Sequence, residues 1–357
     1  MTQDKFSQLL DSFYSLYPEN HNQQCYFFLD EIQNVSGWQT VVRRYLDSKK
    51  VKIYLTGSSA KLLSKEIASS LRGRSIAMEV WPFSFTEFLA AQRLILPKKP
   101  WGRKGMDQLK AWLKDYLLQG GFPEVSCLTE DRPLAEEDRR RILQDYTSVV
   151  IFRDIVERHQ ITNITLIRYL IKTLLKNVGN AFSVNKFYNN LKSQSLSVGK
   201  MTLHDYLSYI EDAYLAFTVP LFSESLRKVQ TNPRKIYAVD TGLVNANTLG
   251  FSENIGHSFE NLVYLDLRRA GHTVYYYLTN SQPRLEVDFL TKDRLGKIHL
   301  FQVCWNIDDE KTLERETTAL KEAGSELNLE GMLVTPESYF TDFLPSLGRF
   351  RNIRAYA

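Results

Sequence analysis

Apolar positions in the first sixty residues switch between helical spacing and short continuous runs. Residues 4–17 carry apolar side chains at helical spacing, and residues 37–47 indicate a second helix. Residues 25–29 form a continuous apolar run of the kind buried on both faces of a parallel sheet, and residues 51–56 indicate the next strand. This alternating order predicts an α/β fold with a parallel sheet.

The next part of the chain predicts a short strand followed by helices. Residues 75–81 indicate a short strand that ends at Trp81-Pro82, and a helix is expected over 85–91. A longer helix is expected over 107–119, because Gly120-Gly121 supplies the glycine that commonly ends a helix.

The middle of the chain is helical in pattern. Residues 134–178 have helical spacing with a break near 161–163, and further helices are expected after Ser183 and after Gly199. Two strand-like runs follow, at 216–221 and 235–239. Helices followed by a hairpin outline a winged helix-turn-helix.

The last third predicts an α+β unit of one helix, three strands, a second helix and a closing strand. The expected ranges are 257–270, 273–278, 285–291, 298–304, 310–323 and 330–334. With the preceding patterns, this predicts three domains, over residues 1–130, 131–245 and 246–357.

Composition narrows the class of protein. The chain has 357 residues, of which 43% are hydrophobic, and a net charge of +4, which permits nucleic-acid contact without arguing for it. Three scattered cysteines with no C-x-x-C pair argue against disulfides and zinc, and for a reducing, cytoplasmic location. No signal-peptide core and no long apolar run occurs, so no membrane association is expected.

The candidate chemistry begins with Asp30-Glu31, two carboxylates directly after an apolar strand. Ligands of α/β sheets bind at the carboxyl ends of strands, so the pair is either part of a nucleotide site or a solvated strand end. Thr56 and Ser58, after the next strand, either orient a water there or form a turn and helix cap.

Two arginines form a further candidate. Arg72 and Arg74 flank Gly73, and they either reach a phosphate, as arginine fingers do, or belong to a solvated turn.

Taken in order, these motifs resemble prokaryotic AAA-superfamily ATPases that carry a C-terminal nuclease-like domain of unknown function. The resemblance extends over essentially the whole chain. It is carried by Leu29-Asp30-Glu31-Ile32-Gln33-Asn34-Val35, Gly37-Trp38, Leu55-Thr56-Gly57-Ser58-Ser59, Leu71-Arg72-Gly73-Arg74, Pro82-Phe83-Ser84-Phe85, Glu87-Phe88 and Gly120-Gly121-Phe122-Pro123-Glu124.

The resemblance implies ATP and Mg²⁺ as cofactors and a role for each candidate residue. Asp30 would be linked to Mg²⁺, and Glu31 would polarise the attacking water. Thr56 or Ser58 would orient that water, and Arg72 or Arg74 would sense phosphate.

The chain departs from this family in one respect. The phosphate-binding loop G-x-x-x-x-G-K-[ST] does not occur in the sequence. The fold is therefore expected to be a truncated P-loop-type AAA core with a parallel sheet, then a winged-helix-like region and a nuclease-like α+β domain. Weak or no ATP hydrolysis is expected from this chain, unless a further segment or a partner supplies the loop.

The C-terminal third resembles a PD-(D/E)-x-K nuclease, in which acids and a lysine hold Mg²⁺ and activate water. Glu260, Asp288, Gln302 and Cys304 stand in the corresponding order. The neutral Gln302 replaces a metal-binding acid and Cys304 replaces the lysine, so a degenerate site is expected.

Two neighbours could repair that site. Lys311 is a spatial substitute for the missing lysine, and Glu286 shares a strand face with Asp288.

Three classes of function remain open at this point. The first is an ATPase with nucleic-acid connections, and the second is a non-enzymatic module that binds nucleic acid or protein. The third is a Mg²⁺-dependent nuclease. A homo-oligomer is a further possible partner arrangement, since arginine fingers can act between subunits.

Overall fold

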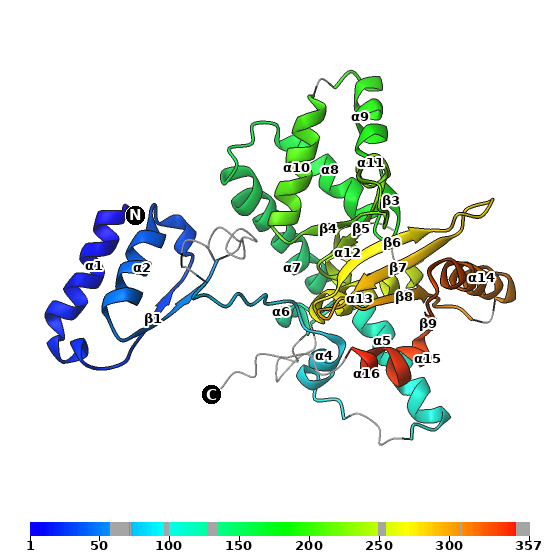
Figure 1. Ribbon diagram of the computed structural model, residues 1–357, viewed down its shortest axis with the longest axis horizontal. Coiled ribbons are helices and arrows are strands. Elements are labelled where there is room, and N and C mark those ends of the chain that lie inside the picture. Colours follow the sequence, from blue (N-terminus) through cyan, green and yellow to red (C-terminus); the bar gives the residue numbers. More distant parts are fainter. Residues whose placement is uncertain are drawn as a thin grey trace. The chain divides into compact units, whose positions relative to one another are not determined.

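The computed structural model describes residues 1–57, 71, 73–95, 100–126, 134–196, 198–248, 255–307 and 309–347 (Figure 1). These form two compact units, Met1–Val80 with Asp212–Tyr214, and Trp81–Glu211 with Leu215–Ala357. The boundary between the units falls at Val80, whereas the predicted domain boundaries are at residues 130 and 245, and residues on both sides of 245 belong to one unit. The finer three-domain division stays a prediction.

The N-terminal unit contains the predicted parallel pair of strands. Its main elements are α1 (Gln3–Leu16), β1 (Cys25–Leu29), α2 (Trp38–Ser48) and β2 (Val51–Leu55). Strands β1 and β2 pair in parallel, with Cys25 opposite Val51 and Leu29 opposite Leu55. The α/β prediction with a parallel sheet is confirmed for this unit.

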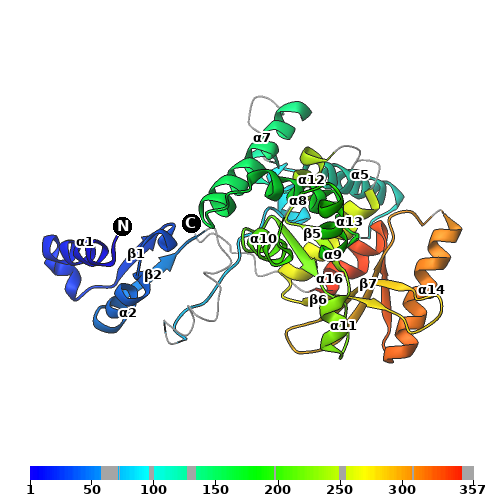
Figure 2. The same cartoon turned by 90° about the horizontal axis from the view of Figure 1, so that it is seen from above.

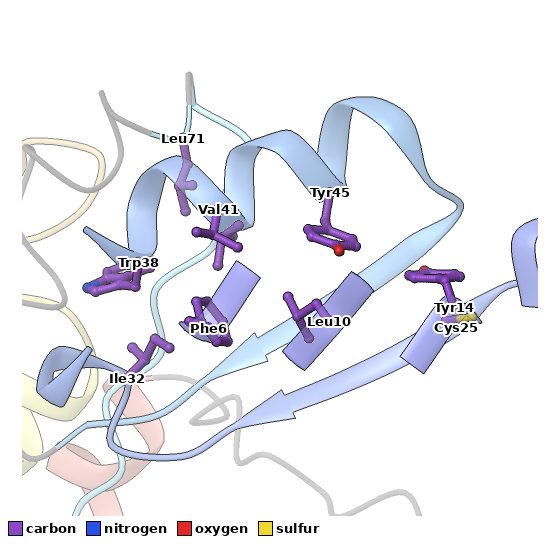
Figure 3. Close-up of a cluster of buried hydrophobic side chains, with 10 residues drawn as sticks. Phe6, Leu10, Tyr14, Cys25, Ile32, Trp38, Val41, Tyr45 and Leu71 are labelled. Atoms are coloured by element: carbon purple, nitrogen blue, oxygen red, sulfur yellow. The ribbon is translucent and has the colours of Figure 1, made fainter. Parts of the chain in front are cut away.

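One face of this sheet makes the core of the unit. Phe27 and Leu29 of β1 pack against the buried faces of α1 and α2, and Tyr14 and Tyr45 stack between the helices (Figure 3). Strand side chains alternate between faces, so Phe28 points to the opposite face and is 75% exposed. The expectation that this strand is buried on both faces is therefore wrong for the described residues.

The predicted strand over 75–81 is wrong. The described residues 73–81 contain no strand, although Ile76, Met78 and Val80 alternate as a strand would. All three of these side chains are exposed. Alternation indicates a period of two, but a strand also needs a neighbour to accept its hydrogen bonds, and the described residues provide none here.

The second unit begins with helices that follow the predicted order. They are α4 (Phe85–Ala91), α5 (Arg103–Gln119), α6 (Pro123–Ser126), α7 (Glu136–Val149) with a π-helical continuation (Val150–Glu157), α8 (Ile164–Lys176), α9 (Val184–Ser193) and α10 (Lys200–Asp212). Side-chain oxygens of Ser84, Asn163 and Ser183 cap the starts of α4, α8 and α9. Each cap satisfies a backbone N–H that has no partner within its helix.

A small antiparallel sheet accompanies these helices. Its strands are β3 (Ala181–Phe182), β4 (Ala216–Val219) and β5 (Arg234–Ala238), and β5 lies between the other two. Two short helices flank β5 in sequence, α11 (Leu226–Thr231) and α12 (Thr241–Asn247). The helices and the two strands expected here are present, but β3 and α11 were not expected, and the winged-helix class itself stays a prediction.

The last part of this unit is a four-stranded sheet between two helices. The elements are α13 (Ile255–Arg269), β6 (Thr273–Leu278), β7 (Glu286–Lys292), β8 (Ile298–Val303), α14 (Glu310–Leu327) and β9 (Gly331–Val334). The short segments α15 (Pro336–Ser338), a π-helical turn (Tyr339–Phe343) and α16 (Leu344–Ser346) follow. The strand order is β6-β7-β8-β9, antiparallel except for β8 with β9.

Helices cover both faces of that sheet (Figure 2). Leu290 of β7 packs with Ala319 and Ala323 of α14. The adjacent Phe289 points to the other face and stacks on Tyr264 of α13. Because β7 is covered on both faces, Val287–Thr291 is buried throughout and any charged group placed there needs a partner inside the protein.

A buried aspartate holds the Gly120-Gly121 motif against the start of α12. Asp240 accepts hydrogen bonds from the backbone N–H groups of Gly121 (2.6 Å) and Leu243 (2.8 Å). Gly120 has φ of 79°, in the region that glycine adopts without strain, and ends α5 as predicted. The Gly120-Gly121 motif therefore serves packing here.

Among the helices of the described residues, none is long and apolar enough to cross a membrane.

Candidate functional site

Asp30, Glu31 and Thr56 meet at the carboxyl ends of β1 and β2. The hydroxyl of Thr56 donates to a carboxylate oxygen of Asp30 and accepts from the backbone N–H of Glu31 at 3.3 Å. The backbone N–H of Thr56 donates to the carbonyl of Leu29 at 3.0 Å. Parallel pairing brings both strand ends to one edge of the sheet, as the sequence indicates.

The backbone turns sharply at Glu31. This residue has φ of 49°, a left-handed conformation that is uncommon outside glycine. The turn starts a short 3₁₀ helix at Ile32, whose buried side chain belongs to the core of the unit. The amide of Gln33 donates to the Glu31 carboxylate and so restrains its direction.

The three side chains form an oxygen-only donor set at an exposed edge. Asp30 and Thr56 are exposed and Glu31 is half-buried. Carboxylate and hydroxyl oxygens are the ligands that a hard cation such as Mg²⁺ prefers. The set therefore fits Mg²⁺ that is also held by other ligands, such as phosphate oxygens and water. Two carboxylates alone do not enclose a metal ion.

Of the other residues predicted for this site, only Arg74 lies within the described residues. The Arg74 guanidinium pairs with Asp47 of α2 at 2.7 Å, and no bond among the described residues joins it to Asp30 or Glu31. Arg72 and Ser58 lie outside the described residues. The assignment of an arginine to phosphate sensing therefore stays a prediction.

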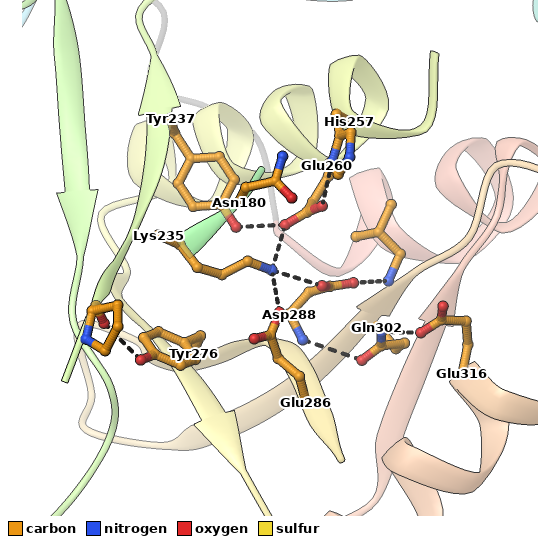
Figure 4. Close-up of polar contacts among 12 residues, drawn as sticks. Asn180, Lys235, Tyr237, His257, Glu260, Tyr276, Glu286, Asp288, Gln302 and Glu316 are labelled. Carbon is orange, nitrogen blue, oxygen red and sulfur yellow. Dashed lines mark hydrogen bonds and ion pairs between the residues drawn. The ribbon is translucent and has the colours of Figure 1, made fainter. Parts of the chain in front are cut away.

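A second group of charged side chains lies inside the second unit, which we call the C-terminal unit. The Lys235 ammonium of β5 lies 2.8 Å from Glu260 of α13, 2.9 Å from Asp288 of β7 and 3.0 Å from Glu286 (Figure 4). Three elements far apart in sequence thus contribute to one cluster. We call Lys235, Glu260, Glu286 and Asp288 the acid–lysine cluster.

Glu260 is the most strongly held acid of the cluster. Tyr237 donates its hydroxyl to Glu260 at 2.6 Å, and the imidazole of His257 lies 3.7 Å from the same carboxylate. Burial is the largest single effect and would raise the pKa of Glu260, but the charge of Lys235 and the contacts of His257, Lys235 and Tyr237 together outweigh it, and the pKa falls to about 2. In turn, the Glu260 carboxylate at 3.7 Å raises the pKa of His257.

The pKa values of Asp288 and Lys235 are shifted by burial and by each other's charge. Burial and the neighbouring Glu260 charge raise the pKa of Asp288, against the opposing effect of Lys235. Burial disfavours the charged form of Lys235, yet the Asp288 and Glu260 carboxylates raise its pKa well above the usual value. The Lys235 ammonium therefore stays protonated and is the positive charge of the cluster.

The remaining predicted residues of this region lie around Asp288. The side-chain oxygen of Gln302 accepts from the backbone N–H of Asp288 at 3.1 Å, and its amide donates to Glu316 of α14. The backbone N–H of Val303 donates to Asp288 at 3.0 Å. Gln302 thus positions Asp288 through its backbone, and its amide is already engaged by Glu316.

A cavity of about 740 Å³ opens beside the cluster. Lys235, Glu260 and Asp288 line it, together with Arg284 and Arg315. Cys304 also borders the cavity, and burial raises the pKa of its thiol. The structure thus brings the four predicted nuclease-like residues to one place.

The lysine beside these acids is not Lys311, which the sequence predicted as a substitute. Lys311 lies exposed on α14, and the ammonium among the acids belongs to Lys235. Glu286 joins the cluster as the alternation along its strand predicts. Lys235 was missed because it lies in the region assigned to the middle domain. Lys235 follows Arg234 at the start of β5, where adjacent cations are typical of a solvated strand end, so no signal for a buried lysine was available in the sequence.

Comparison with known proteins fits the arrangement of the N-terminal unit. An AAA domain profile matches residues 1–89, and a domain of unknown function (DUF8612) matches residues 110–254. The N-terminal part of the chain is therefore an AAA-like domain. No solved structure matches the chain.

Two curated relatives are similar over most of the chain. An uncharacterised protein of Methanocaldococcus jannaschii is 37% identical over 309 residues, covering 85% of this chain and 66% of the relative. An uncharacterised protein of Haemophilus influenzae is 30% identical over 287 residues, covering 80% of this chain and 67% of the relative. The chain belongs to the family of these proteins, and it spans about two thirds of the length of each.

Proposed function

We propose that the protein is an AAA-type ATP-binding protein whose N-terminal unit contributes the acidic side of an ATP·Mg²⁺ site. One observation carries this proposal. Asp30, Glu31 and Thr56 are joined by hydrogen bonds at the carboxyl end of a parallel strand pair. The AAA profile over residues 1–89 supports the same assignment.

Each of the three residues has a distinct task in this proposal. Asp30 holds Mg²⁺, which when bound neutralises charge on the phosphates. Glu31 accepts a hydrogen bond from the attacking water and takes up its proton. Thr56 fixes the Asp30 carboxylate through its hydroxyl and keeps β1 and β2 in register at that edge.

The proposal requires a phosphate-binding loop from outside the printed residues. The printed sequence has no G-x-x-x-x-G-K-[ST], so its acids alone are expected to bind MgATP weakly and to hydrolyse it weakly or not at all. Reading the native gene on both sides of this chain for that motif is the first step. The native gene product is then the enzyme to assay.

Hydrolysis of MgATP by the native product tests the roles directly. Glu31→Gln is expected to retain ATP binding and to lose hydrolysis by about 10²- to 10⁴-fold, as removal of a general base does. Asp30→Asn is expected to weaken binding only when Mg²⁺ is present. Glu19→Gln, an exposed acid of the same unit, is the matched control and should leave both unchanged.

Two results would contradict the proposal. One is a native product that neither binds nor hydrolyses ATP. The other is a Glu31→Gln variant that hydrolyses ATP as fast as the unmodified protein.

A further inference from the structure

Lys235 occupies a fixed place at the centre of a sheet. Strand β5 lies between β3 and β4, and the backbone of Lys235 is opposite Ala181 on one side and Val219 on the other. Its side chain is 2% exposed and extends from β5 into the acids of α13 and β7 (Figure 4). Pairing on both edges of β5 leaves the strand little freedom to withdraw the ammonium.

The residues present do not fit the divalent ion that a nuclease-like fold implies. Such an ion would need the oxygens of Glu260 and Asp288, and both already contact the Lys235 ammonium at 2.8 and 2.9 Å. A metal ion among the same oxygens would lie against a buried positive charge. Within the described ranges, no group of three or more His, Cys, Asp or Glu side chains is arranged to hold a metal.

We propose that Lys235 is the resident cation of this site, so that the carboxylates are compensated by the protein itself and the site takes no divalent metal. The ammonium has three protons, and three carboxylate oxygens lie within 3.0 Å of it. A buried acid is stable only when a charge or hydrogen-bond donors compensate it, and here a side chain does so permanently.

Hydrogen-bond donors add to the compensation of the buried carboxylates by Lys235. Tyr237 donates to Glu260, and the backbone N–H of Val303 donates to Asp288. Glu286 is 43% exposed and so keeps contact with water. The neutral Gln302 suits the arrangement, because an acid at that position would add a buried negative charge beside Asp288.

Two consequences follow for the C-terminal unit. The cluster ties β5 to α13 and β7, so it joins the small sheet to the four-stranded sheet by charge. Without a divalent ion the site cannot activate water in the way that metal-dependent nucleases do.

Binding of Mn²⁺, followed by electron paramagnetic resonance, tests the proposal on the full chain. The Asp30→Asn, Glu31→Gln double variant serves as background, so that the N-terminal acids do not contribute. The expected result is that Mn²⁺ keeps the spectrum of the free ion and that EDTA does not shift the unfolding midpoint. Bound Mn²⁺ that disappears when Asp288→Asn is added would overturn the proposal, whereas bound Mn²⁺ that persists lies elsewhere and supports it.

Removal of the lysine gives a second test. Lys235→Met should gain Mn²⁺ binding and should be stabilised by Mn²⁺, because its acids then lack a cation. Lys311→Met, an exposed lysine of α14, is the matched control and should gain neither. A Lys235→Met protein that folds and gains no Mn²⁺ binding would contradict the proposal. The measurement on the Lys235-containing protein remains decisive if the variant does not fold.

Discussion

The two acidic groups of this protein differ in where their charge compensation comes from. Asp30 and Glu31 stand at an exposed strand edge, with a threonine and a glutamine as their polar partners. Glu260 and Asp288 are buried, and a buried lysine lies between them. The first group is open to a cation from solution, and the second already contains its own.

Burial explains this difference. Exposed carboxylates are solvated by water and can remain without a partner until a ligand arrives. Buried carboxylates without compensation cost several kcal/mol, so a chain that places them inside must also place a cation or donors there. The same residue type therefore indicates a ligand site at the surface and an internal ion pair in the core.

The largest expected effect comes from removing the shared cation. Lys235→Met leaves two buried carboxylates without their positive partner and should lower the free energy of unfolding by about 3–5 kcal/mol. Urea unfolding, followed by circular dichroism, measures the change. A loss below about 1 kcal/mol would mean that the acids are compensated in some other way.

A smaller effect should separate the buried acids from the exposed one of the same cluster. Glu260→Gln breaks charged hydrogen bonds in the core and should cost about 2–3 kcal/mol. Glu286→Gln should cost less than about 1 kcal/mol, because that carboxylate is partly solvated. Equal losses in the two variants would remove burial as the explanation.

The pH dependence of stability should also identify Glu260. Its pKa is about 2 in the folded protein, below its usual value of 4.5. The folded state therefore favours the ionised form, and this stabilisation is present above pH 4.5 and is lost as the pH falls through about 2. The stability difference between the unmodified protein and Glu260→Gln should shrink over that interval. A difference independent of pH would contradict the assignment.

The smallest effects are expected at the exposed edge. Asp30→Asn should change the free energy of unfolding by no more than about 0.5 kcal/mol in the absence of nucleotide, as surface substitutions do. Thr56→Val removes two hydrogen bonds and should cost about 0.5–1.5 kcal/mol. A large loss from Asp30→Asn would show that this edge is a structural ion pair like the internal one.

The local elements of the fold were predictable because they depend on local patterns. A continuous apolar run predicted β1, a mostly apolar run predicted β2, and Gly120 predicted the end of α5. The strand expected over 75–81 failed because the pattern carries no information on which neighbour would pair with it. The edge site was predictable for the same local reason, since Asp30-Glu31 and Thr56 directly follow parallel strands.

The internal cluster was predictable only in part. The order of Glu260 and Asp288 follows from their helix and strand, and Glu286 follows from alternation. The source of the lysine depends on how β5 packs against α13 and β7, which no local pattern encodes. Lys311 is nearer than Lys235 to Asp288 in sequence, but its assignment to the cluster was wrong. Its side chain is exposed on α14, where water solvates the ammonium and no buried acid is needed as a partner.

The most direct test of the account is heteronuclear NMR of the full chain with nitrogen-labelled lysine. Ammonium protons exchange rapidly with water unless the group is buried and hydrogen-bonded. A protected ammonium signal is expected that is absent from Lys235→Arg and is the same in EDTA and in Mg²⁺. A signal that is missing, or that disappears when Mg²⁺ is added, would contradict the claim that Lys235 is the cation of the cluster.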